Sequence, residues 1–303
     1  MDQDFHEINS LMDKEKSISF QEMPDLAKTI AAKLSLLPQV VAVALSGSQT
    51  ARSDQLSDFD FYVYTRSEIS IDIRTAIARQ FATCIEINNQ FWEPGDEWID
   101  TSSGRGVDIM YRTPSWIEDQ LDTVLVKHHA SVGFSTCFWW NVVSSLPLYD
   151  RDGWFMQLQQ KANQSYPEPL RQAIVAKNYP ILRKNISSYL HQLNLAVIRY
   201  DCISINHRTA ALLASYFDII FAVNYVPHPG EKRLIEFSKQ LCKKLPVDME
   251  EHIHNLINAI SVSSAYQNIL DSANALIDGL DELLMAEGLI TESGQLAYLS
   301  QQV

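Results

Sequence analysis

The hydrophobic pattern of this chain changes its period once, and that change limits the folds open to it. Up to about residue 150, short apolar runs rich in β-branched residues alternate with segments of helical spacing. Beyond that point the apolar residues recur at helical spacing, and strand-like runs are missing. The pattern predicts an α+β fold, with a mixed β-sheet flanked by helices in residues 1–150 and an all-helical domain in residues 151–303.

The positions of the elements follow from the same pattern. Apolar runs of β-branched and aromatic residues predict strands at 39–45, 58–65, 84–92 and 105–112. Helical spacing in the first half predicts helices at 24–36, 70–82 and 114–129. In the second half it predicts helices at 170–200, 208–223, 232–245 and 249–287. The acid-rich stretch 93–100 is expected to be a loop.

The charge of the chain is acidic, with 24 Lys and Arg against 37 Asp and Glu and a formal net charge of -13. Binding to nucleic acid needs basic residues clustered on one face, so this balance disfavours a nucleic-acid partner. An acidic surface attracts cations instead, although the same charge also serves solubility alone.

Two further features concern the compartment. No apolar run approaches the roughly 20 residues that a membrane-spanning helix needs, so we expect a cytoplasmic protein without a membrane segment. The four cysteines are widely spaced and form no C-x-x-C pair, which favours buried free thiols over disulfides or zinc ligands: Cys84, Cys137, Cys202 and Cys242. The oligomeric state is not specified by the sequence.

Two aspartates begin the expected strand at 58–65, whose sequence is DFDFYVYT. Side chains alternate across a sheet, so Asp58 and Asp60 share one face. The neighbouring Phe59 and Phe61 then face the core. Two adjacent carboxylates suit Mg²⁺, which takes one or two protein carboxylates and completes its shell with water and substrate phosphates. The alternative is an acid pair on a solvated strand edge.

Other residues extend this pattern on both sides. Gly47 and Ser48 follow the apolar run 39–45, where backbone N–H groups can approach an anion because glycine has no Cβ. Asp108 lies inside the apolar segment 105–112 and would join the aspartates if the two strands are neighbours. A phosphate at the turn and a metal at the acids would together hold a polyphosphate.

The order of these motifs resembles the nucleotidyltransferase superfamily, the fold shared by DNA polymerase β and the antibiotic nucleotidyltransferases. The shared features are a strand, Gly-Ser, a spacer of nine residues, Asp-x-Asp opening a second strand, and a later Asp within an apolar strand. They cover residues 25–125. The helical second half is similar to the helical domain of aminoglycoside nucleotidyltransferases, but it aligns with no single enzyme, and the stretch QTARSDQL within the spacer has no further glycine.

The resemblance implies roles for individual residues. Asp58, Asp60 and Asp108 would be the catalytic and metal-binding set, with Mg²⁺ as cofactor. Asp108 would be a third metal ligand or the general base. Gly47 and Ser48 would hold the terminal phosphates of ATP.

Two basic residues are further candidates for binding the nucleotide. By the same resemblance, Lys232 in the sequence HPGEKRL would reach the triphosphate from the helical domain. Arg52, from its place in the spacer, would assist the phosphates. The alternative for Lys232 is a solvated helix face, and for Arg52 an exposed turn.

The implied activity is the transfer of AMP from ATP to a hydroxyl of a small acceptor, with release of pyrophosphate. An aminoglycoside-like polycation is the first acceptor class, because the acids Glu93, Asp96, Glu97 and Asp100 could line an acceptor pocket and receive ammonium groups. A protein side chain is the second acceptor class. A catalytically weak nucleotide-binding regulatory protein and an RNA-directed enzyme are the competing classes, and the acidic balance disfavours the latter.

Overall fold

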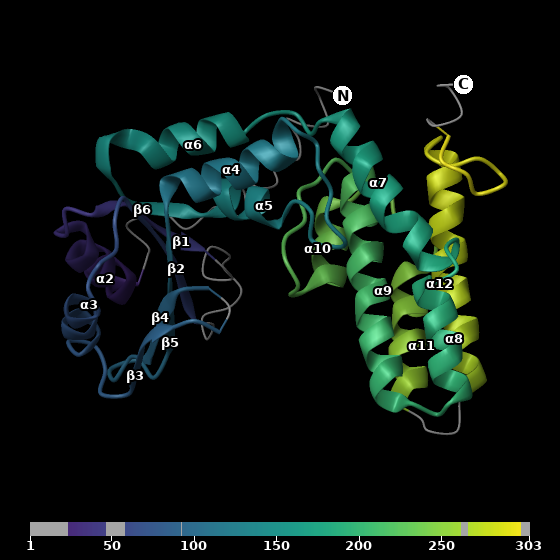
Figure 1. Cartoon of the computed structure of the whole chain (residues 1–303), viewed down its shortest axis with the longest axis horizontal. Helices are drawn as coiled ribbons and strands as arrows, with labels where there is room; N and C mark the ends of the chain where they lie inside the picture. The colour runs from purple at the N-terminus through teal and green to yellow at the C-terminus, as the bar shows by residue number, and fades with distance from the viewer. Residues whose placement is uncertain (1–23, 47–57, 92, 262–265, 298–303) are drawn as a thin grey trace. The chain divides into compact units, whose positions relative to one another are not determined.

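A computed structural model of the chain describes residues 24–46, 58–91, 93–261 and 266–297 (Figure 1). These residues form two compact units. The first contains the described residues up to Asp122 together with Phe138–Ser165, and the second contains Thr123–Cys137 and the described residues from Tyr166 onward. The division therefore differs from a single cut at residue 150: Arg151–Ser165 belongs with the sheet, and Thr123–Cys137 belongs with the helices.

The first unit is built on a mixed six-stranded sheet with the strand order β3-β4-β5-β2-β1-β6. The parallel pair is β2 and β5, and the other neighbouring strands are antiparallel. The strands are β1 (Val40–Ser46), β2 (Phe59–Thr65), β3 (Ile85–Asn89), β4 (Gly95–Ile99), β5 (Gly106–Arg112) and β6 (Leu146–Asp150). With the helices described below, this arrangement confirms the expected α+β class.

One face of the sheet packs against α2 (Asp25–Ser35) and α3 (Ile71–Ala78). The apolar stripe of α2 joins Phe59 and Phe61 of β2 and Trp98 of β4 in one buried core. Burial of this apolar surface is what holds the two helices to the sheet. Ser70 fixes the start of α3, because its hydroxyl accepts a hydrogen bond from the backbone N–H of Ile73.

The opposite face is partly covered by α4 (Pro114–Leu125), α5 (Cys137–Ser144) and α6 (Trp154–Ala162), which Figure 1 shows grouped together. The Tyr64 ring of β2 packs edge-on against Trp154, with centroids 5.1 Å apart, and against Phe155 at 5.4 Å. Aromatic packing thus closes one end of this face, and the acids lie at the other end.

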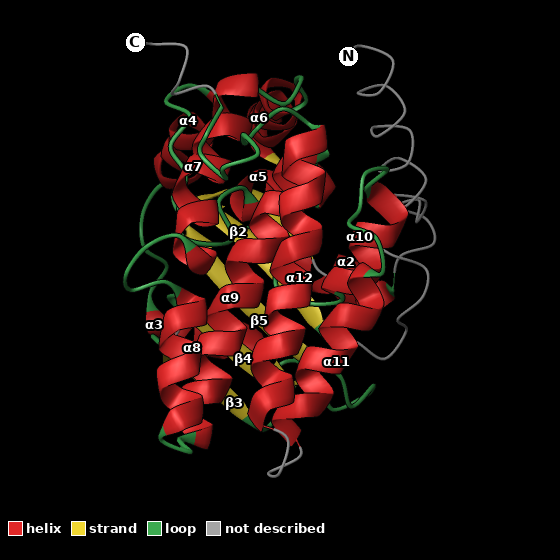
Figure 2. Ribbon diagram, turned by 90° about the vertical axis from the view of Figure 1, so that its right-hand side faces the viewer, coloured by secondary structure: helices red, strands yellow, loops and turns green. Residues whose placement is uncertain are grey.

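The second unit is helical in the described residues after Tyr166, apart from the short bridge between Ile290 and Leu296. Figure 2 shows α8, α9, α11 and α12 as long rods lying side by side. Its helices are α7 (Glu168–Arg183), α8 (Tyr189–Ile198), α9 (Cys202–Val223), α10 (Leu234–Leu241), α11 (Met249–Ser261) and α12 (Tyr266–Ala286).

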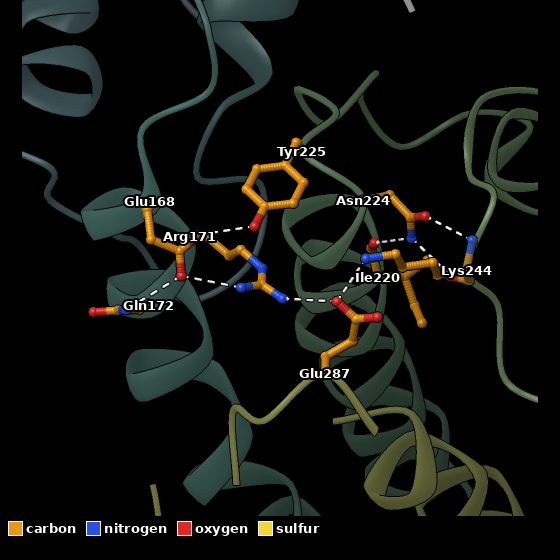
Figure 3. A network of polar contacts seen from close by, with 8 residues as sticks. All are labelled: Glu168, Arg171, Gln172, Ile220, Asn224, Tyr225, Lys244 and Glu287. Atoms are coloured by element: carbon orange, nitrogen blue, oxygen red, sulfur yellow. Dashed lines mark hydrogen bonds and ion pairs between the residues drawn. The ribbon is translucent and has the colours of Figure 1, made fainter. Parts of the chain in front are cut away.

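A charged network ties the ends of three of these helices together (Figure 3). The buried guanidinium of Arg171 on α7 donates at 3.0 Å both to Glu168 and to Glu287, which follows α12. Tyr225, just after α9, donates to Glu168 at 2.9 Å, and Lys244 donates to Glu287 at 2.7 Å. Each charged side chain drawn in Figure 3 therefore has an opposite charge beside it.

A second polar network is centred on Asp218 of α9, which is 1% exposed. Its carboxylate accepts hydrogen bonds from the Ser135 backbone N–H at 3.0 Å, from the Ser135 hydroxyl at 2.6 Å and from Asn178 at 3.1 Å. Asn178 in turn accepts from the backbone N–H of Gly133 at 2.9 Å. These bonds hold Thr123–Cys137 against α7 and α9.

The structure corrects several expected elements. The loop expected at 93–100 contains strand β4, and α5 and β6 were not predicted. The single helix expected at 170–200 is divided into α7 and α8, because Ser188 caps α8 by accepting from the backbone N–H of His191. The helix expected at 249–287 is likewise two helices, α11 and α12.

The expectations about the cysteines and about membrane-spanning helices can be checked in the described residues. The four cysteines are free, as expected, but only Cys242 is buried, whereas Cys84 and Cys202 are exposed and Cys137 is intermediate. Within the described part of the chain, no helix is long and apolar enough to cross a membrane.

Candidate active site

Carboxylates from four neighbouring strands lie in register across the sheet. Asp60 of β2 is opposite Asp108 of the parallel strand β5, and Asp108 is opposite Glu97 of β4. Glu97 is in turn opposite Glu86 of β3. We call these four side chains the acid row. On the other side of Asp60, the residue opposite it in register is the buried Ser46 of β1.

The alternation along each strand places the acid row on the face away from α2 and α3. Phe59 and Phe61 are buried in the core on either side of Asp60, and Val107 and Ile109 flank Asp108 in the same way. Asp60 and Asp108 are themselves only partly buried. The prediction that the phenylalanines face the core is confirmed, as is the prediction that the Asp108 strand neighbours the Asp60 strand.

Asp58 is exposed and lies just before β2, where it is held by the start of β5. The backbone N–H of Gly106 donates to its Oδ1 at 3.1 Å. A Cβ at position 106 would lie 2.5 Å from the same oxygen, so a larger residue there would displace the carboxylate. Gly106 is therefore a positioning residue that the sequence reasoning did not identify.

The acid row is electrostatically uncompensated around Asp108. Burial, together with the negative charges of Glu97 and Asp60, raises the pKa of Asp108 to about 6. No hydrogen bond or ion pair joins Asp108 or Glu97 to another residue of the described chain. A cation at this face would relieve the repulsion between the carboxylates.

The closed end of the same face carries a buried cation that is already paired. Arg112 of β5 donates from Nε and from Nη2 to the carboxylate of Glu93, both at 2.7 Å. Its guanidinium lies 3.9 Å from the ring centroid of Tyr62 and 4.9 Å from that of Trp116. The ion pair joins β5 to the chain before β4. Both carboxylate oxygens of Glu93 are therefore already bound within the first unit.

Two more acids of the stretch 93–100 are also bound by side chains of the first unit. Asp96 is buried on the core side of β4, where it accepts from the Tyr111 hydroxyl at 2.8 Å and pairs with Arg74 at 3.4 Å. Asp100 is also buried, and its Oδ2 accepts from the hydroxyls of the two following serines at 2.6 and 2.7 Å. These hydrogen bonds keep the pKa of Asp100 below its ordinary value, although burial opposes them.

The expectation that all four acids of 93–100 line an acceptor pocket is therefore wrong for Glu93, Asp96 and Asp100, which are bound within the first unit. Of these four acids, Glu97 is the one that lies in register with Asp108 in the acid row. The sequence Gly95-Asp-Glu-Trp-Ile contained a usable signal, because Asp96 and Trp98 alternate with Glu97 as they would in a strand.

The structure does not test the roles of the remaining predicted residues. Gly47, Ser48 and Arg52 lie outside the described residues. Lys232 is exposed, shortly before α10 in the second unit. Their roles in binding a nucleotide stay predictions.

The donor set can be tested against the metal that the resemblance implies. Within the described residues, no group of three or more His, Cys, Asp or Glu side chains is arranged to hold a metal ion. Asp60 and Asp108 nevertheless supply two adjacent, oxygen-only donors, and Mg²⁺ needs only one or two protein carboxylates. The pair fits such an ion, whereas a preassembled three-carboxylate set is not present.

Comparison with known proteins adds little to this geometry. No family model matches the chain, and no curated protein matches it. Among solved structures, the chain is similar to the crystal structure of a nucleotidyltransferase-like protein from Exiguobacterium sibiricum 255-15, at 10% identity and a TM-score of 0.40, with 86% of this chain and 77% of that chain covered. A likeness at that TM-score supports no conclusion about function, so the proposal below depends on the site itself.

Proposed function

We propose that the protein is a nucleotidyltransferase that transfers AMP from ATP to a hydroxyl of a small, cationic acceptor. The observation that carries the proposal is the pairing of Asp60 with Asp108 on adjacent parallel strands, where no described residue forms an ion pair with Asp108. The order of motifs in the sequence supplies the reaction class, because paired carboxylates at this place resemble the nucleotidyltransferase site.

The reaction has a simple balance. The acceptor oxygen forms a bond to the α-phosphorus of ATP, the bond between that phosphorus and the pyrophosphate oxygen breaks, and the hydroxyl proton is released. Asp58 and Asp60 would hold Mg²⁺, with Asp108 as a further ligand or as the base that takes the proton. When bound, the ion would neutralise charge on the phosphates.

The chain's own residues explain how the acids are kept in place. Gly106 holds Asp58 through its backbone N–H, and the alternation of β2 and β5 aims Asp60 and Asp108 at one face. Rigid strands position such groups better than loops do. Gly47, Ser48, Arg52 and Lys232 remain the proposed contacts to the phosphates, on the strength of the resemblance.

The proposal is tested with the full chain, ATP and Mg²⁺. Isothermal titration measures ATP binding with and without Mg²⁺, and pyrophosphate release is then scored with aminoglycosides, neutral sugars and protein acceptors. Asp60→Asn should remove Mg²⁺-dependent turnover. Glu68→Gln is the matched control, because Glu68 is an exposed acid of the first unit outside the acid row.

The outcomes separate the alternatives. Pyrophosphate release with protein acceptors alone would indicate an enzyme that AMPylates proteins. Tight Mg²⁺-dependent ATP binding without release would indicate a nucleotide-binding regulatory protein. Absence of both binding and release would refute the proposal, and a gel shift with tRNA at low salt tests the nucleic-acid partner that the net charge of -13 disfavours.

A further inference from the structure

Helix α8 is apolar on its outer face as well as on its inner face. Its sequence YLHQLNLAVI contains no Asp, Glu, Lys or Arg, and Leu193, Ala196 and Val197 are buried where it packs against α7, α9 and α12. On the opposite side of the helix, Leu195 and Ile198 are exposed and lie three residues apart on one stripe. A helix that is apolar all round is normally buried. The described residues leave this outer face uncovered.

The exposed apolar surface continues through the turn from α8 into α9, where Ile198, Tyr200 and Ile203 are 63%, 70% and 64% exposed. The backbone of Tyr200 has a φ of 55°, and its N–H donates to the Val197 carbonyl at 3.0 Å to close the helix. Glycine is the residue that usually takes this left-handed position after a helix. The turn itself therefore does not require a tyrosine.

We call Leu195, Ile198, Tyr200 and Ile203 the α8 corner. The side chains together form an exposed apolar patch, and patches of a few hundred Å² mark interaction sites in soluble proteins.

The charges around the α8 corner are basic, although the chain has a net charge of -13. Arg199 and Arg208 are both exposed. Arg208 forms no ion pair with a described residue, and the acid near Arg199 is Asp201. The Asp201 carboxylate is already engaged as the cap of α9, because it accepts from the Ser204 backbone N–H at 3.0 Å and from the Ser204 hydroxyl at 2.7 Å. An apolar patch flanked by two arginines complements an apolar surface that carries acids.

A hollow of about 580 Å³ adjoins this surface between the start of α8 and α12. Its lining includes the apolar side chains of Ile186 and Leu270 and the charged side chains of Lys184 and Asp271. His191 lines the hollow and also lies on the outer stripe of α8. The hollow and the α8 corner therefore follow one another along a helix of ten residues, which is about 15 Å long.

We propose that the α8 corner and the adjoining hollow bind an acidic amphipathic helix of a partner protein. The apolar side chains of the partner lie along α8, and its carboxylates pair with Arg199 and Arg208. Helices that bind to such surfaces present anchors at positions i, i+3 or i+4, and i+7. The inference goes beyond the proposed function and does not depend on it, because the surface contains no residue of the acid row.

Charge favours this occupant over two others. A second copy of the chain that used the same surface would bring the arginines of the two copies close together, because a two-fold interface is self-complementary. An anionic membrane would attract the arginines, but its wide surface would also repel a chain with a net charge of -13. A single acidic helix responds to the local charge, because salt screens exposed charges beyond about 10 Å.

The experiment uses the full chain and a fluorescein-labelled helical peptide of about 15 residues, with Leu on one face and Glu on the other. A second peptide carries Lys in place of Glu, and a third has the composition of the first in scrambled order. Fluorescence anisotropy measures binding. We expect the acidic amphipathic peptide to bind about tenfold or more tightly than either control peptide, and less tightly as salt is raised.

The natural cysteines of the chain locate the bound peptide. Cys202 lies between Tyr200 and Ile203 and is exposed, so the bound peptide should slow its alkylation by iodoacetamide severalfold. Cys84 is an exposed thiol of the first unit and is the internal control, whose alkylation should not change. Mass spectrometry of the digested chain measures both rates in one sample.

Variants assign the binding to the surface. Ile198→Ser and Arg208→Glu should each weaken binding of the acidic peptide by about tenfold. Val247→Ser and Lys177→Glu are the matched controls, because they change an exposed apolar residue and an exposed cation elsewhere in the helical unit. Tyr200→Gly separates binding from folding: it should weaken binding yet raise the midpoint of thermal unfolding, since glycine suits a positive φ.

Several results would overturn the proposal. Equal binding of the acidic and basic peptides, unprotected Cys202, or parental affinity in Ile198→Ser would each refute it. A dimer in sedimentation velocity that Ile198→Ser dissociates would assign the surface to a second copy instead. Sedimentation with phosphatidylserine vesicles that Arg208→Glu abolishes would assign it to a membrane, and that result also contradicts a protein partner.

Discussion

In the charged network of the helical unit, side chains of opposite charge lie beside one another, whereas in the acid row of the sheet the neighbouring side chains carry the same charge. In the helical unit, Arg171 lies between Glu168 and Glu287, and Lys244 supplies a further cation to Glu287. In the sheet, Asp108 lies between Asp60 and Glu97, and all three carry the same sign. The first arrangement pairs acids with cations, whereas Asp108 and Glu97 have no ion pair to any residue in the described part of the chain.

This difference shows how to separate acids that serve the fold from acids that serve a ligand. A charge taken out of water is costly unless an opposite charge or hydrogen bonds accompany it. Asp96 is fully buried yet well bonded, so its substitution would damage the fold. Asp108 is less buried but repelled by its neighbours, so its presence lowers the stability of the unliganded protein.

The largest effect is expected from the acid row. Asp60→Asn should lower Mg²⁺-dependent turnover by about a hundredfold or more, because it removes a carboxylate that the transition state needs. The same holds for Asp58→Asn. Steady-state pyrophosphate release measures the effect, with Glu68→Gln as the exposed control. Turnover at the parental rate in both Asn variants would show that these acids hold no metal.

Stability should move in the opposite direction in the two regions. Arg171→Ala should destabilise the protein by about 3 kcal/mol, because it removes a buried guanidinium with charged hydrogen bonds to both Glu168 and Glu287 and leaves them only Tyr225 and Lys244. Asp60→Asn should leave the unliganded protein as stable as the parent or more so, because it relieves repulsion.

Chemical denaturation of both variants tests this contrast. Lys239→Ala is the control for Arg171, since its ion pair with Glu250 is exposed and should contribute no more than about 1 kcal/mol. If Arg171→Ala costs as little as Lys239→Ala, the network of the helical unit is not structural. If Asp60→Asn destabilises the protein, the acid row is not a site of repulsion.

A smaller effect is expected on the pH dependence of the helical unit. Burial raises the pKa of Asp218 from 3.8 to about 7, although hydrogen bonds from Ser135 and Asn178 oppose it. The folded state thus favours the neutral acid, so this contribution to stability is complete below about pH 4 and is lost as the pH rises through 7.

Hydrogen exchange of peptides from α7 and α9 between pH 4 and 8, corrected for the intrinsic exchange rate, measures this loss. Asp218→Asn cannot ionise and should flatten the profile, whatever its effect on the absolute stability. A profile as steep in the variant as in the parent would assign the pH dependence to other groups.

The smallest effect is expected from Lys232→Ala, which should raise the KM for ATP more than it lowers kcat. A point charge on the outer phosphates helps the ground state and the transition state alike. Lys33→Ala, an exposed lysine of α2, is the control. An unchanged KM for ATP would indicate that Lys232 lies on a solvated helix face and does not contact the nucleotide.

Local sequence patterns predicted part of the site well. The alternation in DFDFYVYT correctly placed Phe59 and Phe61 in the core and Asp60 on the other face, whereas Asp58 lies just before the strand. It also led to Asp108 through the apolar residues around it. The period of side chains in a strand is two, so a few residues are enough to read which face each one occupies.

The same reasoning failed where neighbours outside the segment decide the structure. The stretch 93–100 was read as a loop because Pro94, Gly95 and its acids are typical of turns. Its pairing with β3 and β5 makes it a strand, and pairing is a non-local event. The break between α7 and α8 does not show in the helical spacing of apolar residues. Its local signal is Ser188, whose hydroxyl caps the start of α8.

By itself, the sequence determined the α+β class, the change from sheet to helix along the chain, and the face on which Asp60 and Asp108 lie. These features depend on side-chain period and composition, which are local. Only the tertiary structure decided that Glu97 joins the acid row while Glu93, Asp96 and Asp100 are bound within the fold. The partners of a charge are distant in the chain, so its cost or benefit is set when the strands come together.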